Sequence, residues 1–397
     1  SLSLSLSLSL SLSLFLFFIF FFLFCLLFIS FSPRDRISFQ ILLLGFALLV
    51  CLPAVCSAQG GGQGAFVGLD GNNSLVIRPP VDGQVLIDGA DFRVLVAKVQ
   101  ALEQRLKEQQ CVTVADTTTI TGLNDTGNWN GGVLAGNGNI YGIPRNSAVV
   151  LIIDPTTYTV DVTSITGLSG NAKWVGGVLA GNDKIYGIPY SSASVLIIDP
   201  TTNTADTTTI SGLDGAYKWA GGVVVGNGKI YGIPWDSSSV LIIDPGAGTA
   251  DTTTITGLSE SCCKWRGGVL AGNGKIYGIP LNSASVLIID PTTNTVDTTT
   301  ITGLSGSSKW HGGVLASNRK IYGIPRTSPS VLIIDPTTDT ADTSTITGLG
   351  VGTMKWFGGV LAGNGKIYGA PYDSESVLII DPTTNTADTT TITGLSP

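Results

Sequence analysis

The sequence predicts an all-β protein whose main domain is a β-propeller of six four-stranded blades. Residues 112–397 repeat a block of about 45 residues six times, with the pattern Trp-x-Gly-Gly-Val-Leu-Ala-Gly-Asn-Gly-Lys-Ile-Tyr-Gly-Ile-Pro. Repeats of this length form propellers, solenoids or other arrays. Each unit also contains four strand-like runs, which favours the propeller. The tryptophans that mark the units lie 45 or 46 residues apart and are Trp129, Trp174, Trp219, Trp265, Trp310 and Trp356.

Composition and charge exclude some classes of partner. The 397 residues are 43% apolar and only 12% charged, so Ser, Thr and Gly must cover much of the surface. The 21 basic and 28 acidic residues give a net charge of -7, and the repeats contain no Lys/Arg block. We therefore expect neither a nucleic acid nor an anionic membrane surface as a partner.

The first 58 residues do not read as part of a folded domain. Residues 1–33 alternate Ser with Leu and then become rich in Phe and Leu, as a translated dinucleotide repeat and polypyrimidine tract would. We interpret them as upstream, intronic or fragment-derived sequence, with a membrane anchor as the alternative. Residues 34–58 combine Arg34 and Arg36 with an apolar stretch and small residues up to Ala58, the form of a secretory signal peptide. We expect a secreted, extracellular protein, and a protein anchored by its N-terminal apolar segment is the alternative.

Residues 59–90 are predicted to form a Gly-rich linker followed by a short β-hairpin. The two strand-like runs are Ser74–Pro80 and Gly83–Gly89, and Pro-Pro-Val-Asp-Gly supplies the turn between them.

Residues 91–111 are predicted to form an amphipathic helix. Apolar residues from Phe92 to Leu106 follow three- and four-residue spacings with charged residues between them, which is a coiled-coil-like seam. The helix either packs on the propeller alone or forms a homo-oligomerising stalk through residues 92–111, locked by Cys111.

The cysteine count supports the second possibility. Removal of the leader leaves Cys111, Cys262 and Cys263, and an odd number in an oxidising compartment suggests a bond between chains. Cys262 and Cys263 are adjacent, so they form either a vicinal disulfide or a free or mixed-disulfide pair.

The second unit illustrates the expected blade. Its four strand-like runs are Trp174–Ala180, Lys184–Pro189, Ser194–Asp199 and Ala205–Leu213. The third run is apolar on both faces, as expected for a sheet sandwiched between neighbouring blades. Gly176-Gly177 in the first run allows close approach near the axis, where a side chain would not fit.

Turn residues separate these runs. Gly-Asn-Gly-Lys suits a tight hairpin between the first two strands, and Asp-Pro-Thr-Thr suits a type I turn with Asp first and Pro second. The turn therefore explains the repeated aspartates without assigning them any chemistry: Asp154, Asp199, Asp244, Asp290, Asp335 and Asp381.

The units also resemble a known family. Gly-Asn-Gly-Lys-Ile-Tyr-Gly-Ile-Pro followed by Ser-Val-Leu-Ile-Ile-Asp-Pro-Thr-Thr-Asn-Thr is similar to the YVTN-type β-propeller repeat, and more distantly to the NHL and kelch groups, over about residues 113–397. The chain departs from the YVTN type in its Trp-x-Gly-Gly start, its Gly-Ile-Pro and its Thr-rich last strand. The resemblance implies a propeller fold and little about function.

The number of blades has one complication. The fourth-strand motif occurs a seventh time at Ala115–Leu123, ahead of the first tryptophan. Either this segment competes with Thr389–Leu395 for the closing position, or the chain comes from a longer array. We expect six blades.

No catalytic constellation is recognisable, so we expect no enzyme, no cofactor and no metal site. The single histidine, His311, is too little for a His-based metal site or triad. The Gly-Asn-Gly turns lack the strand-to-helix context of phosphate-binding loops.

The differences between the units predict the ligand-binding residues. The loop entering the first strand and the loop between the second and third strands should lie on one face, and most of the variation falls there. Trp, Tyr and Arg, which are typical of binding hot spots, are frequent in it. The alternative is drift at unconstrained loops. The predicted binding residues are Asn130, Arg145, Tyr190, Trp235, Arg266, Leu281, His311, Arg326, Phe357 and Tyr372.

We therefore expect a non-enzymatic, secreted or cell-surface scaffold that binds a protein or a glycan through this face. The alternatives are a propeller hydrolase or lactonase, and a protein whose Thr-rich outer strands bind polysaccharide or ice.

Overall fold

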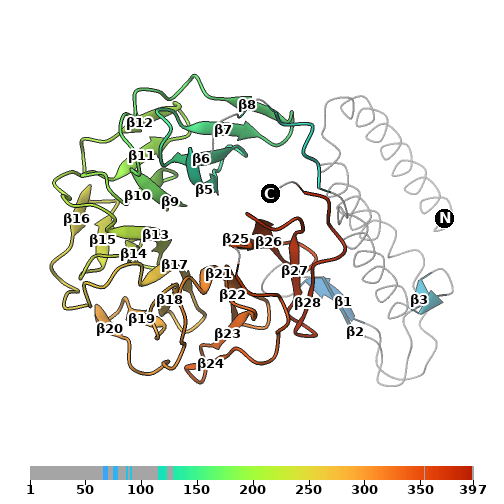
Figure 1. The fold of residues 1–397 in the computed structure, drawn as a ribbon. Helices are drawn as coiled ribbons and strands as arrows, with labels where there is room; N and C mark the ends of the chain where they lie inside the picture. Colours follow the sequence, from blue (N-terminus) through green and yellow to red (C-terminus); the bar gives the residue numbers. More distant parts are fainter. Residues whose placement is uncertain are drawn as a thin grey trace, which may run out of the picture. The chain divides into compact units, whose positions relative to one another are not determined.

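The computed structural model describes residues 115–121, 123, 128–352 and 354–395, and the backbone of four short strands between residues 66 and 91. The chain divides into two compact units, residues 1–106 and residues 107–397. The second unit is a β-propeller (Figure 1).

The first unit contains two short antiparallel pairs. β1 (Phe66–Leu69) pairs with β2 (Leu75–Arg78), and β3 (Leu86–Ile87) pairs with β4 (Ala90–Asp91). The expected strand positions are thus occupied by β2 and β3, but the pairing differs from the single hairpin predicted. Asp-Gly between β3 and β4 is the preferred sequence of a two-residue hairpin turn, which explains the local pairing. The predicted leader and residues 92–111 of the predicted helix lie outside the described residues, and Asp91 belongs to β4 instead of the helix.

The propeller consists of six antiparallel sheets, each built from one repeat in the order first to fourth strand. The innermost strands are β5 (Trp129–Leu134), β9 (Trp174–Leu179), β13 (Trp219–Val224), β17 (Trp265–Leu270), β21 (Trp310–Leu315) and β25 (Trp356–Leu361). The second strands are β6 (Ile140–Pro144), β10 (Ile185–Pro189), β14 (Ile230–Pro234), β18 (Ile276–Pro280), β22 (Ile321–Pro325) and β26 (Ile367–Pro371). The third strands are β7 (Leu151–Asp154), β11 (Leu196–Asp199), β15 (Leu241–Asp244), β19 (Leu287–Asp290), β23 (Leu332–Asp335) and β27 (Leu378–Asp381). The outermost strands are β8 (Thr159–Asp161), β12 (Thr204–Asp206), β16 (Thr249–Asp251), β20 (Thr295–Asp297), β24 (Thr340–Asp342) and β28 (Thr386–Asp388).

The fourth strand is shorter than predicted. In the second unit it ends at Asp206, and the following threonines form a bend rather than an outer strand. The backbone amides of Thr208 and Thr209 donate to Asp206 Oδ1, and both hydroxyls donate to the same carboxylate. A local cap of this kind competes with strand pairing. In the next unit the Thr254 hydroxyl and the Thr253 amide hold the pKa of Asp251 at about 2.

The first strands meet near the axis through glycine. A Cβ atom added to Gly176 would lie 3.0 Å from Gly221 Cα, and a Cβ atom added to Gly177 would lie 2.7 Å from Ile143 Cδ1 of the preceding blade. The same contacts recur at the following interfaces between blades. The prediction that Gly-Gly permits close approach is therefore confirmed.

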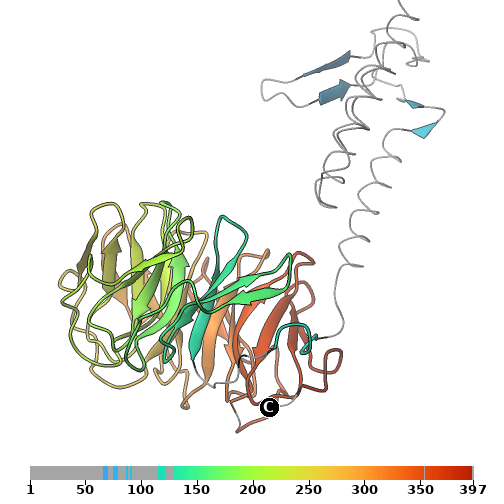
Figure 2. The same cartoon turned by 90° about the horizontal axis from the view of Figure 1, so that it is seen from above.

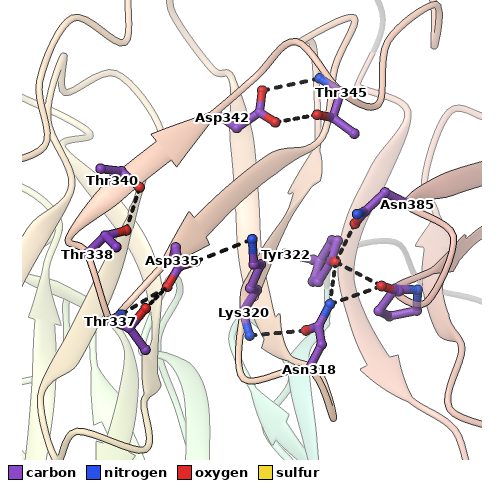
Figure 3. Close-up of polar contacts among 11 residues, drawn as sticks. Asn318, Lys320, Tyr322, Asp335, Thr337, Thr338, Thr340, Asp342, Thr345 and Asn385 are labelled. Atoms are coloured by element: carbon purple, nitrogen blue, oxygen red, sulfur yellow. Dashed lines mark hydrogen bonds and ion pairs between the residues drawn. The ribbon is translucent and has the colours of Figure 1, made fainter.

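Polar contacts of the second-strand tyrosine with the Asp-Pro turn of the next blade tie blade 1 to blade 2 and link blades 3 to 6 in succession. The Tyr322 hydroxyl donates a hydrogen bond to Asn385 Oδ1 of blade 6 at 2.6 Å. It also accepts a hydrogen bond from Asn318 Nδ2 at 2.9 Å (Figure 3). Lys320 Nζ lies 3.3 Å from Asp335 Oδ2 within blade 5, and Asp342 caps its turn as described above (Figure 3). The conserved pattern of the repeat is thus used for packing and turns.

A buried lysine before the marker tryptophan links neighbouring loops. Lys309 Nζ donates to the carbonyl oxygens of Leu281, Ser283 and Gly306 at 3.1, 2.9 and 2.9 Å. Burial lowers the pKa of Lys309 to about 8, although three carbonyl acceptors favour its charged form. Equivalent buried lysines are Lys173, Lys218, Lys264 and Lys355. Their burial was not predicted from the sequence.

The step from blade 6 back to blade 1 differs from the other five. The first strands pack successively from β5 to β25, but β25 and β5 lack a comparable contact (Figure 1). Val360 is 64% exposed and Leu134 is 62% exposed, whereas Val314 at the position equivalent to Val360 is 8% exposed. The described part of Ala115–Leu123 forms no strand, and β28 supplies the fourth strand of blade 6.

Seen after a 90° turn, the strands of the propeller run across its thickness, so the loops gather on two faces (Figure 2). None of the described residues form a helical segment with the length and apolar character of a membrane span.

We predict that Gly222→Ala destabilises the propeller by about 1–3 kcal/mol, because the new methyl group would lie 2.6 Å from Ile188 Cδ1 in a packed core. The matched control is Gly226→Ala, where an added Cβ atom meets nothing within 4 Å. Urea unfolding of both variants checks this, and equal midpoints for the two would contradict it.

Candidate binding site on the variable face

The two variable loop sets lie on one face, as predicted. The Lys173 amide at the end of an entry loop donates to the Arg145 carbonyl oxygen in the preceding blade's loop between second and third strands. On the other side, Asn273 Nδ2 in a Gly-Asn-Gly turn donates to the Pro336 carbonyl oxygen of the next blade. The Gly-Asn-Gly and Asp-Pro-Thr-Thr turns therefore share the opposite face. We call the face with the entry loops the variable face.

A β-bulge presents the residue after each marker tryptophan. In blade 4, Trp265 pairs with Pro280 and Gly268 pairs with Gly278, so β17 carries one extra residue between these pairs. Arg266 lies in this bulge, next to Gly267 with a φ of 72°. Bulges re-aim side chains, and this one recurs in every blade. Arg266, His311 and Phe357 occupy the equivalent position in three successive blades.

Three rings from blades 5 and 6 form a stack. The ring centres of His311 and Phe357 are 4.4 Å apart, those of Phe357 and Tyr372 are 3.9 Å apart, and both pairs are inclined by 10°. The Arg326 guanidinium lies 5.1 Å from the centre of the Phe357 ring. One aromatic ring is therefore in contact with another ring on each side and with a cation.

Arg266 joins this stack to the aromatic residues of blades 2 and 3. Its guanidinium carbon lies 5.9 Å from the Phe357 ring centre and 5.0 Å from that of Trp235. Trp235 packs edge-on against Tyr190 at 5.8 Å, and Tyr190 packs against Tyr217 at 5.1 Å. We call the whole set the aromatic–arginine cluster: Tyr190, Tyr217, Trp235, Arg266, His311, Arg326, Phe357 and Tyr372.

Several polar atoms of the cluster are buried without a hydrogen-bond partner. They are both ring nitrogens of His311 and the Nε atoms of Arg266 and Arg326. Burial, followed by the charges of Arg266 and Arg326, holds the pKa of His311 well below 6.5, so its imidazole is neutral. Burial also lowers the pKa of Arg266 to about 10, and the neighbouring arginines add to this shift. Among the described residues, no carboxylate lies within ion-pair distance of either arginine.

Seven of the ten predicted residues belong to the cluster. Of the other three, Leu281 is 2% exposed and packs beside Tyr190 and Trp235. Arg145 and Asn130 lie on blade 1, and the Arg145 charge contributes to lowering the pKa of Arg266.

Exposure divides the cluster into a floor and a rim. Tyr190 and Trp235 are 7% and 8% exposed, so they form a buried floor. Tyr372 is 53% exposed and Tyr217 is 48% exposed, so they form the rim. Tyr217 was not predicted, although it stands in a variable entry loop. Met354 was also not predicted to belong to the site, although its sulfur accepts a hydrogen bond from Arg326 Nη2 at 2.8 Å.

Cys262 and Cys263 form a vicinal disulfide, one of the two possibilities left open by the sequence. The Cys263 amide donates to Asp236 Oδ1 at 2.7 Å, and the Cys263 side chain packs against the Tyr190 and Trp235 group. Asp236 and the two sulfurs lie within 4.8 Å of one another. Because the sulfurs are bonded to each other, they offer no thiolate ligands to a metal.

No protein-family model matches the chain, and no curated protein matches it in sequence. Its fold is similar to solved propellers. A catalytically inactive virginiamycin B lyase from Staphylococcus aureus, solved with quinupristin, aligns with a TM-score of 0.55 and 9% identity over 68% of this chain and 87% of that chain. A streptogramin B lyase aligns with a TM-score of 0.52 and 11% identity over 68% and 84%.

The extracellular domain of a one-component system from B. thetaiotaomicron aligns with a TM-score of 0.52 and 11% identity, over 68% of this chain and 37% of that chain. At such low identity these likenesses show the propeller fold alone. The YVTN repeat family itself stays a prediction.

We predict that His311 stays neutral at pH 6.5 and takes up a proton only well below that pH, because burial and two arginines oppose the imidazolium. Arg266→Gln should raise its pKa. The chain has a single histidine, so its NMR signal is unambiguous. A titration midpoint at or above 6.5 in the unaltered protein would contradict the geometry described.

Proposed function

We propose that the protein is a non-enzymatic binding module that recognises a protein or a glycan through the aromatic–arginine cluster of its variable face. One observation carries this proposal: seven of the ten predicted positions, at which the repeats differ, belong to one continuous set of contacts. Tyr, Trp and Arg dominate binding hot spots, and the cluster is built mainly from these residues.

The rest of the repeat supports this division of roles. Glycines, isoleucines, buried lysines and capping aspartates recur because they pack blades or close turns. Arg266 and His311 lie in the same backbone position as Val175 and Ala220, so packing does not require a polar group there.

The alternatives have less support. Lyases share the fold, but His311 has no acidic partner among the described residues, and a general base needs an orienting group and a reacting group in reach. Binding of ice or polysaccharide by a flat threonine array needs extended outer strands. Thr208 and Thr209 instead lie in a bend, where they donate to Asp206.

Secretion and oligomerisation remain parts of the proposal. The pattern of residues 34–58 and the likeness to an extracellular domain both favour an extracellular location. A stalk through residues 92–111 and Cys111 would make the binding multivalent.

We predict that Tyr372→Ala weakens binding of any ligand recovered from a glycan array or pull-down by about 5- to 30-fold, since an exposed aromatic rim residue is lost. The matched control is Tyr158→Ala, which removes a 62% exposed tyrosine in an Asp-Pro-Thr-Thr turn of the opposite face. Affinities measured by calorimetry on the full chain check this. Equal effects of the two substitutions, or none from either, would argue against the variable face.

A further inference from the structure

We propose that the aromatic–arginine cluster binds the carboxylate group of a small acidic ligand, either the acidic sugar unit of a glycan or an aromatic carboxylic acid. This inference rests on the proposed function of the same face and names the chemistry that the face recognises.

The uncompensated positive charge of the cluster favours binding of an anion. Arg266 and Arg326 both lie against the Phe357 ring, and the charge of Arg145 also reaches Arg266. No described carboxylate forms an ion pair with these three arginines, although the chain as a whole carries a net charge of -7. Bringing like charges together away from water without a counterion is unfavourable, so a bound anion would stabilise the arrangement.

The buried nitrogen atoms without partners favour a ligand group that accepts hydrogen bonds. Arg266 Nε and Arg326 Nε are buried donors with no acceptor, and the neutral His311 ring adds one further donor. Buried polar atoms are nearly always satisfied in native proteins, so each of these requires a partner. A carboxylate offers two oxygens with about four acceptor positions, and arginine forks match its plane.

The rings fit the remainder of such a ligand. The His311, Phe357 and Tyr372 stack ends at Tyr372, whose side chain is 53% exposed, and Tyr217 presents a second exposed ring. Flat aromatic faces pack against the apolar face of a sugar or against another aromatic ring. The acidic protein as a whole repels a polyanion, which favours a ligand with one or a few carboxylates.

Calorimetric titration of the full chain at low salt tests the proposal. The probes are trigalacturonate and benzoate, each compared with its methyl ester, and the two acids distinguish a sugar source from an aromatic source. We expect at least one acid to bind and its ester to bind at least about tenfold more weakly, because the ester lacks the charge.

Substitutions locate the site. Arg266→Gln and Arg326→Gln should each weaken binding of the acid about tenfold or more, while Arg319→Gln, an exposed arginine in a Gly-Asn-Gly-type turn of the opposite face, should not. Melting temperatures without ligand show whether each variant folds. Because Arg326 lies on a loop, its variant keeps the test valid if Arg266→Gln unfolds.

The outcomes separate this inference from the proposed function. Equal binding of acid and ester, or equal losses from Arg326→Gln and Arg319→Gln, would overturn the carboxylate site. If neither acid binds at millimolar concentration while another ligand binds and depends on Tyr372, the carboxylate inference is wrong and the binding function stands. If no ligand depends on Tyr372, the proposed function fails first.

Discussion

The propeller depends on the insertion of an isoleucine from one blade into the space left by a glycine of the next. Ile188 of blade 2 occupies the position that a Cβ atom on Gly222 of blade 3 would need, and the contact recurs along the ring. Since five interfaces use the same isoleucine–glycine pair, a substitution of either residue disturbs the packing at whichever interface it falls. The repeat is therefore held constant through the body of each blade. Most differences fall in the entry loops and at the residues after the marker tryptophan and after the second-strand proline.

The sequence predicts most of the blade because its signals are local. Gly-Gly marks the first strand, and Gly-Asn-Gly and Asp-Pro mark the turns after the first and third strands. The first three strands lie where expected. The fourth strand was predicted to be too long, because β-branched threonines favour strands while Asp206 captures the same segment as a cap. The burial of Lys309 was not predicted because lysines usually lie on the surface. Its three carbonyl acceptors come from loops of two blades, which are not adjacent in the sequence. The missing contact between β25 and β5 was not predicted, because near-identical repeats do not show how the last blade meets the first.

The candidate site could be predicted as a set of positions but not as a set of contacts. Counting along the repeat placed Arg266, His311 and Phe357 at one backbone position. Sequence spacing did not reveal that Arg266 of blade 4 reaches Trp235 of blade 3 and Phe357 of blade 6. It also did not separate buried residues from exposed ones, since exposure is decided by neighbours from other blades. The cluster therefore combines a floor that packs with a rim that remains accessible.

We infer that the constant positions stabilise the propeller, whereas the variable cluster is kept for recognition. A scan of all single substitutions over residues 128–395, read out by resistance to proteolysis, tests it most directly. We expect substitutions at the axial glycines and their isoleucine partners to abolish resistance. Most substitutions at Arg266, His311, Arg326 and Tyr372 should leave it near that of the unaltered chain, because Tyr372 is exposed and the buried polar atoms of the other three that lack partners do not stabilise the fold. Equal sensitivity of the two sets would contradict the account.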